Sequence, residues 1–152
     1  IRAVAYSDTQ NNEAAIDDLT AVVQLDSTQT LAYWQRAVCQ ARLNAFNASQ
    51  GTDISMKTAN VLSDLSVAIE NNPSAILYYN RGNVYVQRKD YLHAIEDYSK
   101  AIEMDSHLAE AYYNRGIARL ALKQQAQAVA DLSKAGELGL YAAYSIIKQN
   151  RK

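Results

Sequence analysis

The stretch Tyr78-Tyr79-Asn80-Arg81-Gly82 recurs 34 residues later, at residues 112–116, with the same five residue types in the same order. A second stretch, residues 94–101, is echoed at residues 128–135 with the same offset. Two blocks that share one spacing are typical of a protein built from stacked copies of one structural unit. Such units bury their apolar faces only against their neighbours, so the repeat decides the fold.

Two earlier copies precede these. Residues 33–37 lie 45 residues before the first stretch, whereas residues 64–70 lie only 33 residues before their counterparts, so twelve residues have been inserted between them. The polar segment 44–55 is the insertion site and its composition indicates a loop. Its apolar residues Phe46, Ile54 and Met56 leave a second interpretation open, in which both helices of the unit are longer. A lip of a binding groove and a structural elaboration are equally supported.

The apolar residues of each unit recur at steps of three and four, which indicates two helices per unit. Predicted N-caps are Asn72 before Pro73, Asp90 and Asn11. Gly139 is expected to end the last repeat helix, and a final helix of about residues 140–149 would cap the array.

These residues resemble a run of tetratricopeptide repeats, which are helix-turn-helix units of 34 residues. The family pattern has an aromatic residue early in the first helix, and Tyr33, Tyr78 and Tyr112 supply it. It has a small residue where the two helices touch, which is met by Ala3, Ala37, Gly82 and Gly116. The second helix carries Ala, a large residue and Ala in turn, as in Ala94, Tyr98, Ala101 and in Ala128, Leu132, Ala135. Tyr6 and Tyr85 supply the large residue expected one turn after the small one, whereas Gln40 and Arg119 depart from it.

The resemblance implies an all-α fold, a right-handed superhelical solenoid of antiparallel helix pairs that forms a single domain over residues 1–152. We expect a partial repeat at 1–29, a repeat with the insertion at 30–74, repeats at 75–108 and 109–139, and a capping helix at 140–150. The missing start of the first repeat suggests the C-terminal fragment of a larger bacterial protein of this family. The compartment stays open, although residues 134–141 resemble the ends of exported bacterial members, which favours a periplasmic location.

The composition of the chain limits the classes of partner that we expect it to bind. Fifteen basic and sixteen acidic side chains nearly balance. The net charge of the chain therefore produces no electrostatic potential that would attract nucleic acid. Residues 1–76 carry a net charge of −4 and residues 77–152 a net charge of +3. No apolar run approaches the ~20 residues of a membrane span, so membrane insertion is not expected. The single Cys39 is interpreted as a small core residue.

Aromatic residues provide the best indication of a binding surface. Trp34, Tyr79 and Tyr113 each follow a core aromatic by one residue, about 100° around the helix, and would line the concave face. With them we predict a peptide-binding groove that also includes Val38, Arg42, Asn80, Asn83, Gln87, Asn114 and Ile117. Packing onto the adjacent first helices is the competing interpretation. A clamp for a terminal carboxylate, known in the family, is incomplete because Trp34 and Tyr79 stand where a Lys is needed.

Other residue patterns predict structure rather than chemistry. Arg2, Arg36, Arg81 and Arg115 recur one unit apart and are expected to pair with acidic residues such as Asp64, Asp97 and Asp131. His93 with Glu96 and His107 with Glu110 are too few to form a metal site, and no catalytic set or cofactor site is predicted.

The sequence therefore predicts a non-catalytic module that binds a protein or peptide segment in its groove. Two alternatives remain. The segment could serve structure or self-assembly, including a homo-oligomer formed through the truncated N-terminal repeat, or it could position a substrate for an enzyme whose catalytic part lies elsewhere.

Overall fold

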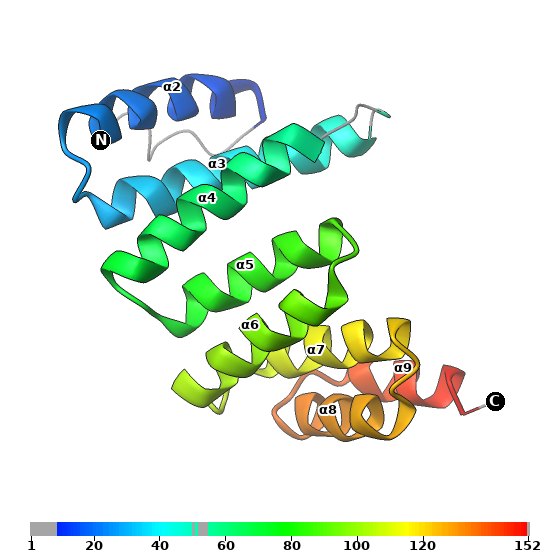
Figure 1. Ribbon diagram of the computed structural model, residues 1–152. Coiled ribbons are helices and arrows are strands. Elements are labelled where there is room, and N and C mark those ends of the chain that lie inside the picture. Colours follow the sequence, from blue (N-terminus) through cyan, green and yellow to red (C-terminus); the bar gives the residue numbers. More distant parts are fainter. Residues whose placement is uncertain (1–8, 50, 52–54, 152) are drawn as a thin grey trace. The chain divides into compact units, whose positions relative to one another are not determined.

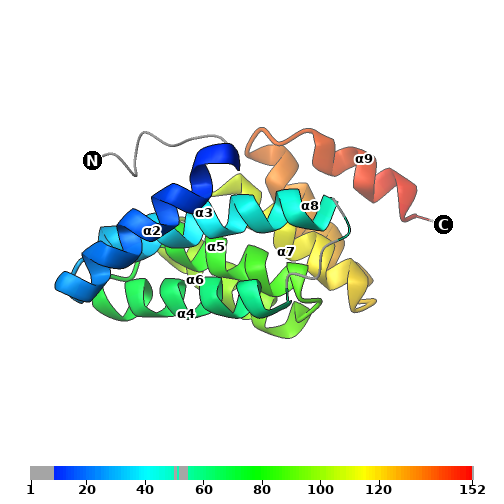
Figure 2. The ribbon, with the colours of Figure 1, turned by 90° about the horizontal axis from the view of Figure 1, so that it is seen from above.

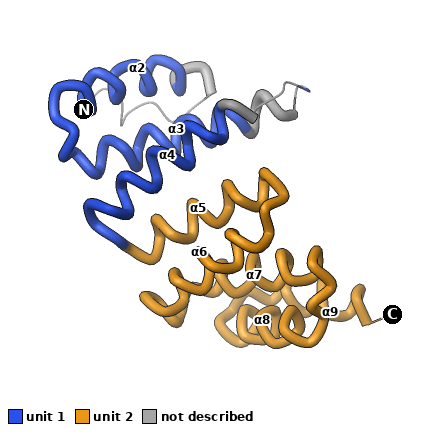
Figure 3. Tube along the Cα trace, in the orientation of Figure 1, with its two compact units in different colours: residues 1–73 blue, residues 74–152 orange. Residues whose placement is uncertain are grey.

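The computed structural model describes residues 9–49, 51 and 55–151. All regular secondary structure in this part of the chain is α-helix, and turns and short loops connect the helices (Figure 1). It divides into two compact units, residues 1–73 and 74–152 (Figure 3). Unit 1 contains α2 (Thr9–Leu25), α3 (Thr30–Ser49) and α4 (Ser55–Asn71). Unit 2 contains α5 (Ala75–Gln87), α6 (Tyr91–Met104), α7 (Ala109–Ala121), α8 (Gln125–Glu137) and α9 (Ala142–Gln149). The predicted all-α class is confirmed.

In unit 1, α3 packs against both α2 and α4 (Figure 2). The core between α2 and α3 is formed by Ala15, Leu19 and Val23 from α2, with Ala32 and Cys39 from α3. Cys39 is only 6% exposed, and burial raises the pKa of its thiol. Since burial disfavours the thiolate, the interpretation of Cys39 as a core residue is confirmed.

The inserted residues lengthen the helices of unit 1. Helix α3 has 20 residues and α4 has 17, whereas α5 and α7 have 13 each. Residues 44–49 and 55 are helical, so the loop interpretation is wrong for them and the alternative of longer helices is confirmed there. Residue 51 is in a turn, and residues 50 and 52–54 lie outside the described residues. Asn44 is fully buried, so packing overrides a weak local preference against helix. The side chains of Phe46, Ile54 and Met56 lie outside the described residues.

In unit 2, α5 packs against α6 and α7 against α8, while α6 contacts α7 and α8 contacts α9. Three of these contacts have a glycine at the point of closest approach: Gly82 between α5 and α6, Gly116 between α7 and α8, and Gly136 between α8 and α9. A β-carbon built on Gly116 would lie 2.8 Å from Cγ of Leu132, so α7 and α8 approach closely as predicted. Gly136 makes a similar approach to the ring of Tyr144, which the sequence pattern did not indicate.

Only one of the three predicted helix N-caps is observed in the structure. Asp90 is the N-cap of α6, as predicted, because its carboxylate accepts from the backbone N–H of His93 at 3.3 Å. Ser74, not Asn72, caps α5, since its extended backbone directs Oγ to the N–H of Leu77. Asn11 is not a cap, because α2 already begins at Thr9.

The C-terminal boundary agrees with the prediction. Gly139 has a φ of +105°, and the N–H of Leu140 donates to the carbonyl of Ala135 at 3.0 Å, which closes the end of α8. Helix α9 follows, and its buried Ala143 and Ile147 join Leu132 and Ala135 in one core cluster. The predicted capping helix is thereby confirmed.

An ion pair joins the two helices of each complete hairpin. The guanidinium groups of Arg36, Arg81 and Arg115 make two hydrogen bonds each, of 2.6–2.9 Å, to Asp64, Asp97 and Asp131 respectively. Each guanidinium also lies 5.5–5.7 Å from the ring centroid of Tyr33, Tyr78 or Tyr112. The predicted pairing is confirmed, and the bond to Asp raises the pKa of Arg36 and of Arg81. Arg2, Ala3 and Tyr6 lie outside the described residues.

Candidate functional site

The predicted groove residues of unit 2 lie on the first helices of its two hairpins. Tyr79, Asn80, Asn83 and Gln87 belong to α5, and Tyr113, Asn114 and Ile117 belong to α7. Gln87 is exposed, and the others are partly buried. Helices α5 and α7 contact one another, so the structure brings side chains of the two repeats together.

Three of these residues form one polar network. The side-chain amide of Asn114 donates to Oδ1 of Asn83 at 2.9 Å and to the hydroxyl of Tyr79 at 3.2 Å. The hydroxyl of the buried Tyr98, on α6, donates to the same Oδ1 of Asn83 at 2.6 Å. These bonds join α5, α6 and α7, so the network holds Tyr79, Asn83 and Asn114 in defined orientations.

The ring of Tyr98 also packs against the ring of Tyr79, a member of this network. It lies 6.0 Å from the ring of Tyr79, centroid to centroid, at an interplanar angle of 46°. Tyr98 is 1% exposed, and burial raises the pKa of its phenol, with the neighbouring Tyr79 acting in the same direction. Tyr98 therefore remains a neutral hydrogen-bond donor near neutral pH. The sequence assigned Tyr98 only to packing, because no one-repeat spacing indicates its bond to Asn83.

Tyr113 and Ile117 occupy a different environment from Tyr79. Both pack, while partly buried, against the core cluster of Leu132, Ala135, Ala143 and Ile147 from α8 and α9. The C-terminal hairpin and the capping helix therefore take up part of the Tyr113 ring. This packing involves the second helix α8 and the capping helix α9, so it does not test the competing interpretation of packing onto the adjacent first helices.

The predicted residues of unit 1 lie along α3. Trp34 and Val38 are partly buried and Arg42 is exposed. The indole Nε1 of Trp34 is buried and has no hydrogen-bond partner among the described residues. Trp34 therefore offers its ring, rather than its N–H group, to its surroundings.

The two histidines serve helix ends rather than a shared site. Nδ1 of His93 lies 2.6 Å from the carboxylate of Asp90, and its ring stacks on Tyr85 at 5.2 Å. His107 follows Asp105, whose carboxylate accepts from the His107 backbone N–H at 3.0 Å. Within the described ranges, no three His, Cys, Asp or Glu side chains gather where they could hold a metal ion. None of the described helices is long and apolar enough to span a bilayer.

Comparison with known proteins gives consistent results. The sequence profile of the TPR repeat matches residues 82–123. A curated human protein, tetratricopeptide repeat protein 13, is 30% identical over 111 residues, which are 70% of this chain but only 12% of the human protein. The chain thus spans about an eighth of the length of that relative.

Two solved structures show the likeness in space. A crystal structure of MamA has a TM-score of 0.71 and 28% identity, and the match covers 88% of this chain and 67% of MamA. The first TPR of Spaghetti (RPAP3), bound to the HSP90 peptide SRMEEVD, has a TM-score of 0.62 and 23% identity. That match covers 76% of this chain and 90% of the Spaghetti domain, and at this identity it supports the fold alone.

Proposed function

Because the chain belongs to the tetratricopeptide repeat family, we propose that it is a non-catalytic module that binds an extended peptide segment of a partner protein. The proposed contact surface is the part of the predicted groove that lies in unit 2, on α5 and α7. That a related fold, the Spaghetti domain, holds a peptide supports this class of partner.

The observation that carries the proposal is the network of Tyr79, Asn83 and Asn114. A ring and two amides from adjacent repeats are fixed by hydrogen bonds of 2.9 and 3.2 Å and rest on the buried Tyr98. A surface whose side chains are already ordered loses less conformational freedom when a ligand binds. Aromatic rings and amides together suit a peptide, since they supply apolar area and backbone hydrogen bonds.

Electrostatics favour a weakly charged segment on this surface in unit 2. The polar groups of the network are neutral, and the Arg81 and Arg115 guanidinium groups are already engaged with Asp97 and Asp131. Recognition there would rest on hydrogen bonds and apolar contact rather than on ion pairs. We therefore expect the affinity for a bound peptide to depend little on salt.

The test begins with selection of binders from a random dodecapeptide library displayed on phage, using residues 1–152 as the target. The affinity of the best peptide is then measured by calorimetry for the parent protein and for a Tyr79→Ala/Asn114→Ala variant. Loss of these side chains is expected to weaken binding about 100-fold or more, because buried aromatic contacts dominate such interfaces.

A matched control removes exposed apolar residues elsewhere. Leu92→Ala/Met104→Ala truncates two side chains of α6 that are 64% and 51% exposed. This variant should bind the selected peptide as the parent does. If the groove variant keeps full affinity while its circular dichroism is unchanged, or if only the control loses binding, the assignment of the groove is wrong.

A further inference from the structure

Unit 1 contains a cavity of about 290 Å³ at the junction of its three helices. Its lining is mostly polar and comes from α2, α3 and α4: Ile16, Thr20, Arg36, Gln40, Asn60, Ser63 and Asp64. Asn60 and Ser63 are exposed and lie at its rim, whereas the side chain of Asp64 is 12% exposed. Sites for whole small molecules occupy about 300–1,000 Å³. At about 290 Å³ this cavity lies at the small end of that range and is large enough for one side chain.

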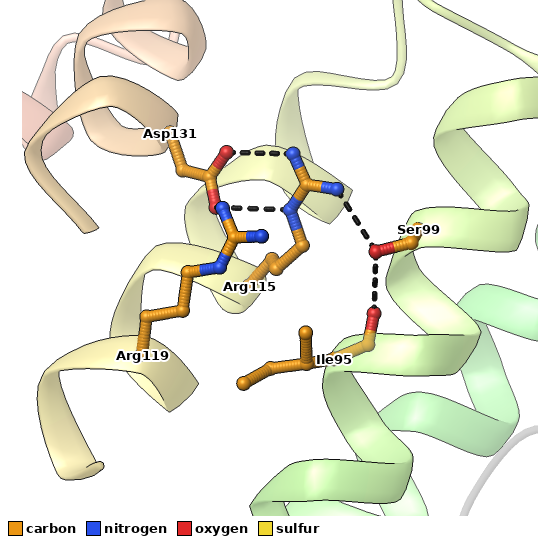
Figure 4. A network of polar contacts seen from close by, with 5 residues as sticks. All are labelled: Ile95, Ser99, Arg115, Arg119 and Asp131. Carbon is orange, nitrogen blue, oxygen red and sulfur yellow. Dashed lines mark hydrogen bonds and ion pairs between the residues drawn. The ribbon is translucent and has the colours of Figure 1, made fainter. Parts of the chain in front are cut away.

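Unit 2 contains the same framework of side chains, with α6, α7 and α8 in place of α2, α3 and α4 (Figure 4). There, Arg115 donates from Nη1 to Ser99 Oγ at 3.0 Å, and that hydroxyl donates to the carbonyl of Ile95 at 2.7 Å. In unit 1, Arg36 donates from Nη1 to Thr20 Oγ1 at 3.2 Å, and Thr20 donates to the Ile16 carbonyl at 2.7 Å. The two arrangements differ by a constant 79 residues across these positions.

One position of this framework differs in its chemistry. Arg119 lies one turn after Arg115 and places Nη1 2.6 Å from Oδ2 of Asp131, so this carboxylate binds two guanidinium groups. The residue in the same position of unit 1 is Gln40. Its side-chain amide donates to Asn44 at 2.9 Å instead. Among the residues that the structure describes, Arg36 is the one guanidinium bound to Asp64, and the open volume lies beside this carboxylate.

We propose that this cavity binds the guanidinium group of an arginine side chain presented by a partner protein. The incoming guanidinium takes the place on Asp64 that Arg119 takes on Asp131, and Asn60 and Ser63 supply further acceptor oxygens at the rim. A guanidinium carries five donors in a planar fork and suits such a carboxylate-centred site.

The charge of the surrounding unit agrees with a cationic ligand. Residues 1–73 carry eight acidic and four basic side chains, a net charge of −4, which attracts cations. The cavity is also separate from the predicted groove. Arg36 and Gln40 lie about 200° around α3 from Trp34 and Val38, because each step along a helix turns by about 100°. The two sites can therefore be tested independently.

The probe is N-acetyl-arginine N-methylamide, titrated into ¹⁵N-labelled protein and followed by NMR. The neutral analogue N-acetyl-citrulline N-methylamide has nearly the same shape and is the matched ligand control. We expect saturable shifts in the amides of Thr20, Gln40 and Asn60 with the arginine probe. The citrulline probe should bind at least about tenfold more weakly, since it lacks the charge-assisted hydrogen bonds. Equal binding of the two probes would overturn the proposal.

Two variants exchange the chemistry of the two frameworks. Gln40→Arg should fill the cavity as Arg119 fills its counterpart, and should weaken binding of the arginine probe at least about tenfold. Gln40→Met, of similar size but without charge, should retain binding. Arg119→Gln should create a second site, detected as new probe-dependent shifts around Asp131 in unit 2.

Failure of the arginine-binding proposal for this cavity can be distinguished from failure of the proposed peptide binding by the groove. The Tyr79→Ala/Asn114→Ala variant should bind the arginine probe as the parent does, even though it loses the selected peptide. If Gln40→Arg, with unchanged backbone shifts elsewhere, still binds the probe with the parental affinity, the cavity does not bind the guanidinium. Absence of a second site in folded Arg119→Gln would likewise contradict the role assigned to Asp64.

Discussion

The ring of Tyr98 lies directly over the α-carbon of Gly82, so that a β-carbon built on the glycine would be 2.7 Å from Cε1 and 2.9 Å from Cδ1. The two residues bring α5 and α6 together at their crossing, and Tyr98 is only 1% exposed. Its hydroxyl is fixed in addition by Asn83 at 2.6 Å. A shift of the ring away from Gly82 would therefore disturb both its packing and its bond to Asn83.

Gly82→Ala is expected to lower the free energy of unfolding by about 1–3 kcal/mol, because the overpacked ring must shift and its bond to Asn83 must lengthen. Urea unfolding followed by circular dichroism measures the change. Gly136→Ala is the comparison, since Tyr144, which faces Gly136, is 46% exposed and can move aside. A larger loss for Gly136→Ala than for Gly82→Ala would contradict the role given to Tyr98.

Asp131→Asn should be strongly destabilising. The side chain of Asp131 is 5% exposed and binds both Arg115 and Arg119, which are 15% and 18% exposed. Removing its charge leaves two partly buried guanidinium groups together, at a cost of about 3 kcal/mol or more. The exposed pair of Lys100 and Glu103, at 3.7 Å, supplies the control, because Glu103→Gln should change stability by no more than about 0.5 kcal/mol. Equal urea midpoints for the two variants would refute the prediction.

Tyr98 should resist ionisation at alkaline pH. Burial raises its folded-state pKa, while in the unfolded chain it ionises near pH 10. Its contribution to stability is therefore complete below pH 10 and is lost as the pH rises further. Phenolate absorbance should therefore contain a step, assigned to Tyr98, that occurs only upon unfolding. That late ionisation step should vanish in the Tyr98→Phe variant. It should persist in the control variant Tyr141→Phe, because Tyr141 is 74% exposed.

Asp26 should titrate at an unusually low pH. Its carboxylate accepts from Gln29 Nε2 at 2.7 Å, from Thr28 Oγ1 at 2.6 Å and from the Thr28 N–H at 2.9 Å, and these bonds lower its pKa to about 2. Because the folded-state pKa is depressed, the contribution of these bonds to stability is present above pH 4 and is lost as the pH falls towards 2. Carbon-detected NMR should give a midpoint near 2, and Gln29→Ala should raise it; an unchanged midpoint in that variant would exclude the Gln29 bond as its main cause.

The hairpins and their ion pairs could be predicted because they depend on spacing within one repeat. Arg115 and Asp131 stand sixteen residues apart, as do Arg81 and Asp97, so two copies of the same spacing indicate the same contact. The sequence left the length of α3 open between a loop and a longer helix, since Asn and Ser favour loops locally and only the burial of Asn44 reveals the competing packing.

The candidate groove was predicted as a set of positions, but its internal bonds were not. The bond from Asn114 to Asn83 joins residues 31 apart, a diagonal neighbour rather than an equivalent position in the next repeat. Arg119 was interpreted only as a departure from the family pattern, because that pattern places a large residue such as Tyr85 one turn after the small one. Only coordinates show that Arg119 shares the carboxylate of Asp131 with the arginine one turn before it.

Each bidentate pair joins an arginine and an aspartate that belong to the same hairpin, as Arg115 and Asp131 do on α7 and α8. A gene duplication or deletion that adds or removes one whole hairpin therefore brings or takes away both charges together. No buried ion is orphaned by such an event, and the net charge contributed by the pair is zero. Arrays of this kind can change their length in evolution without an electrostatic penalty at the new junction.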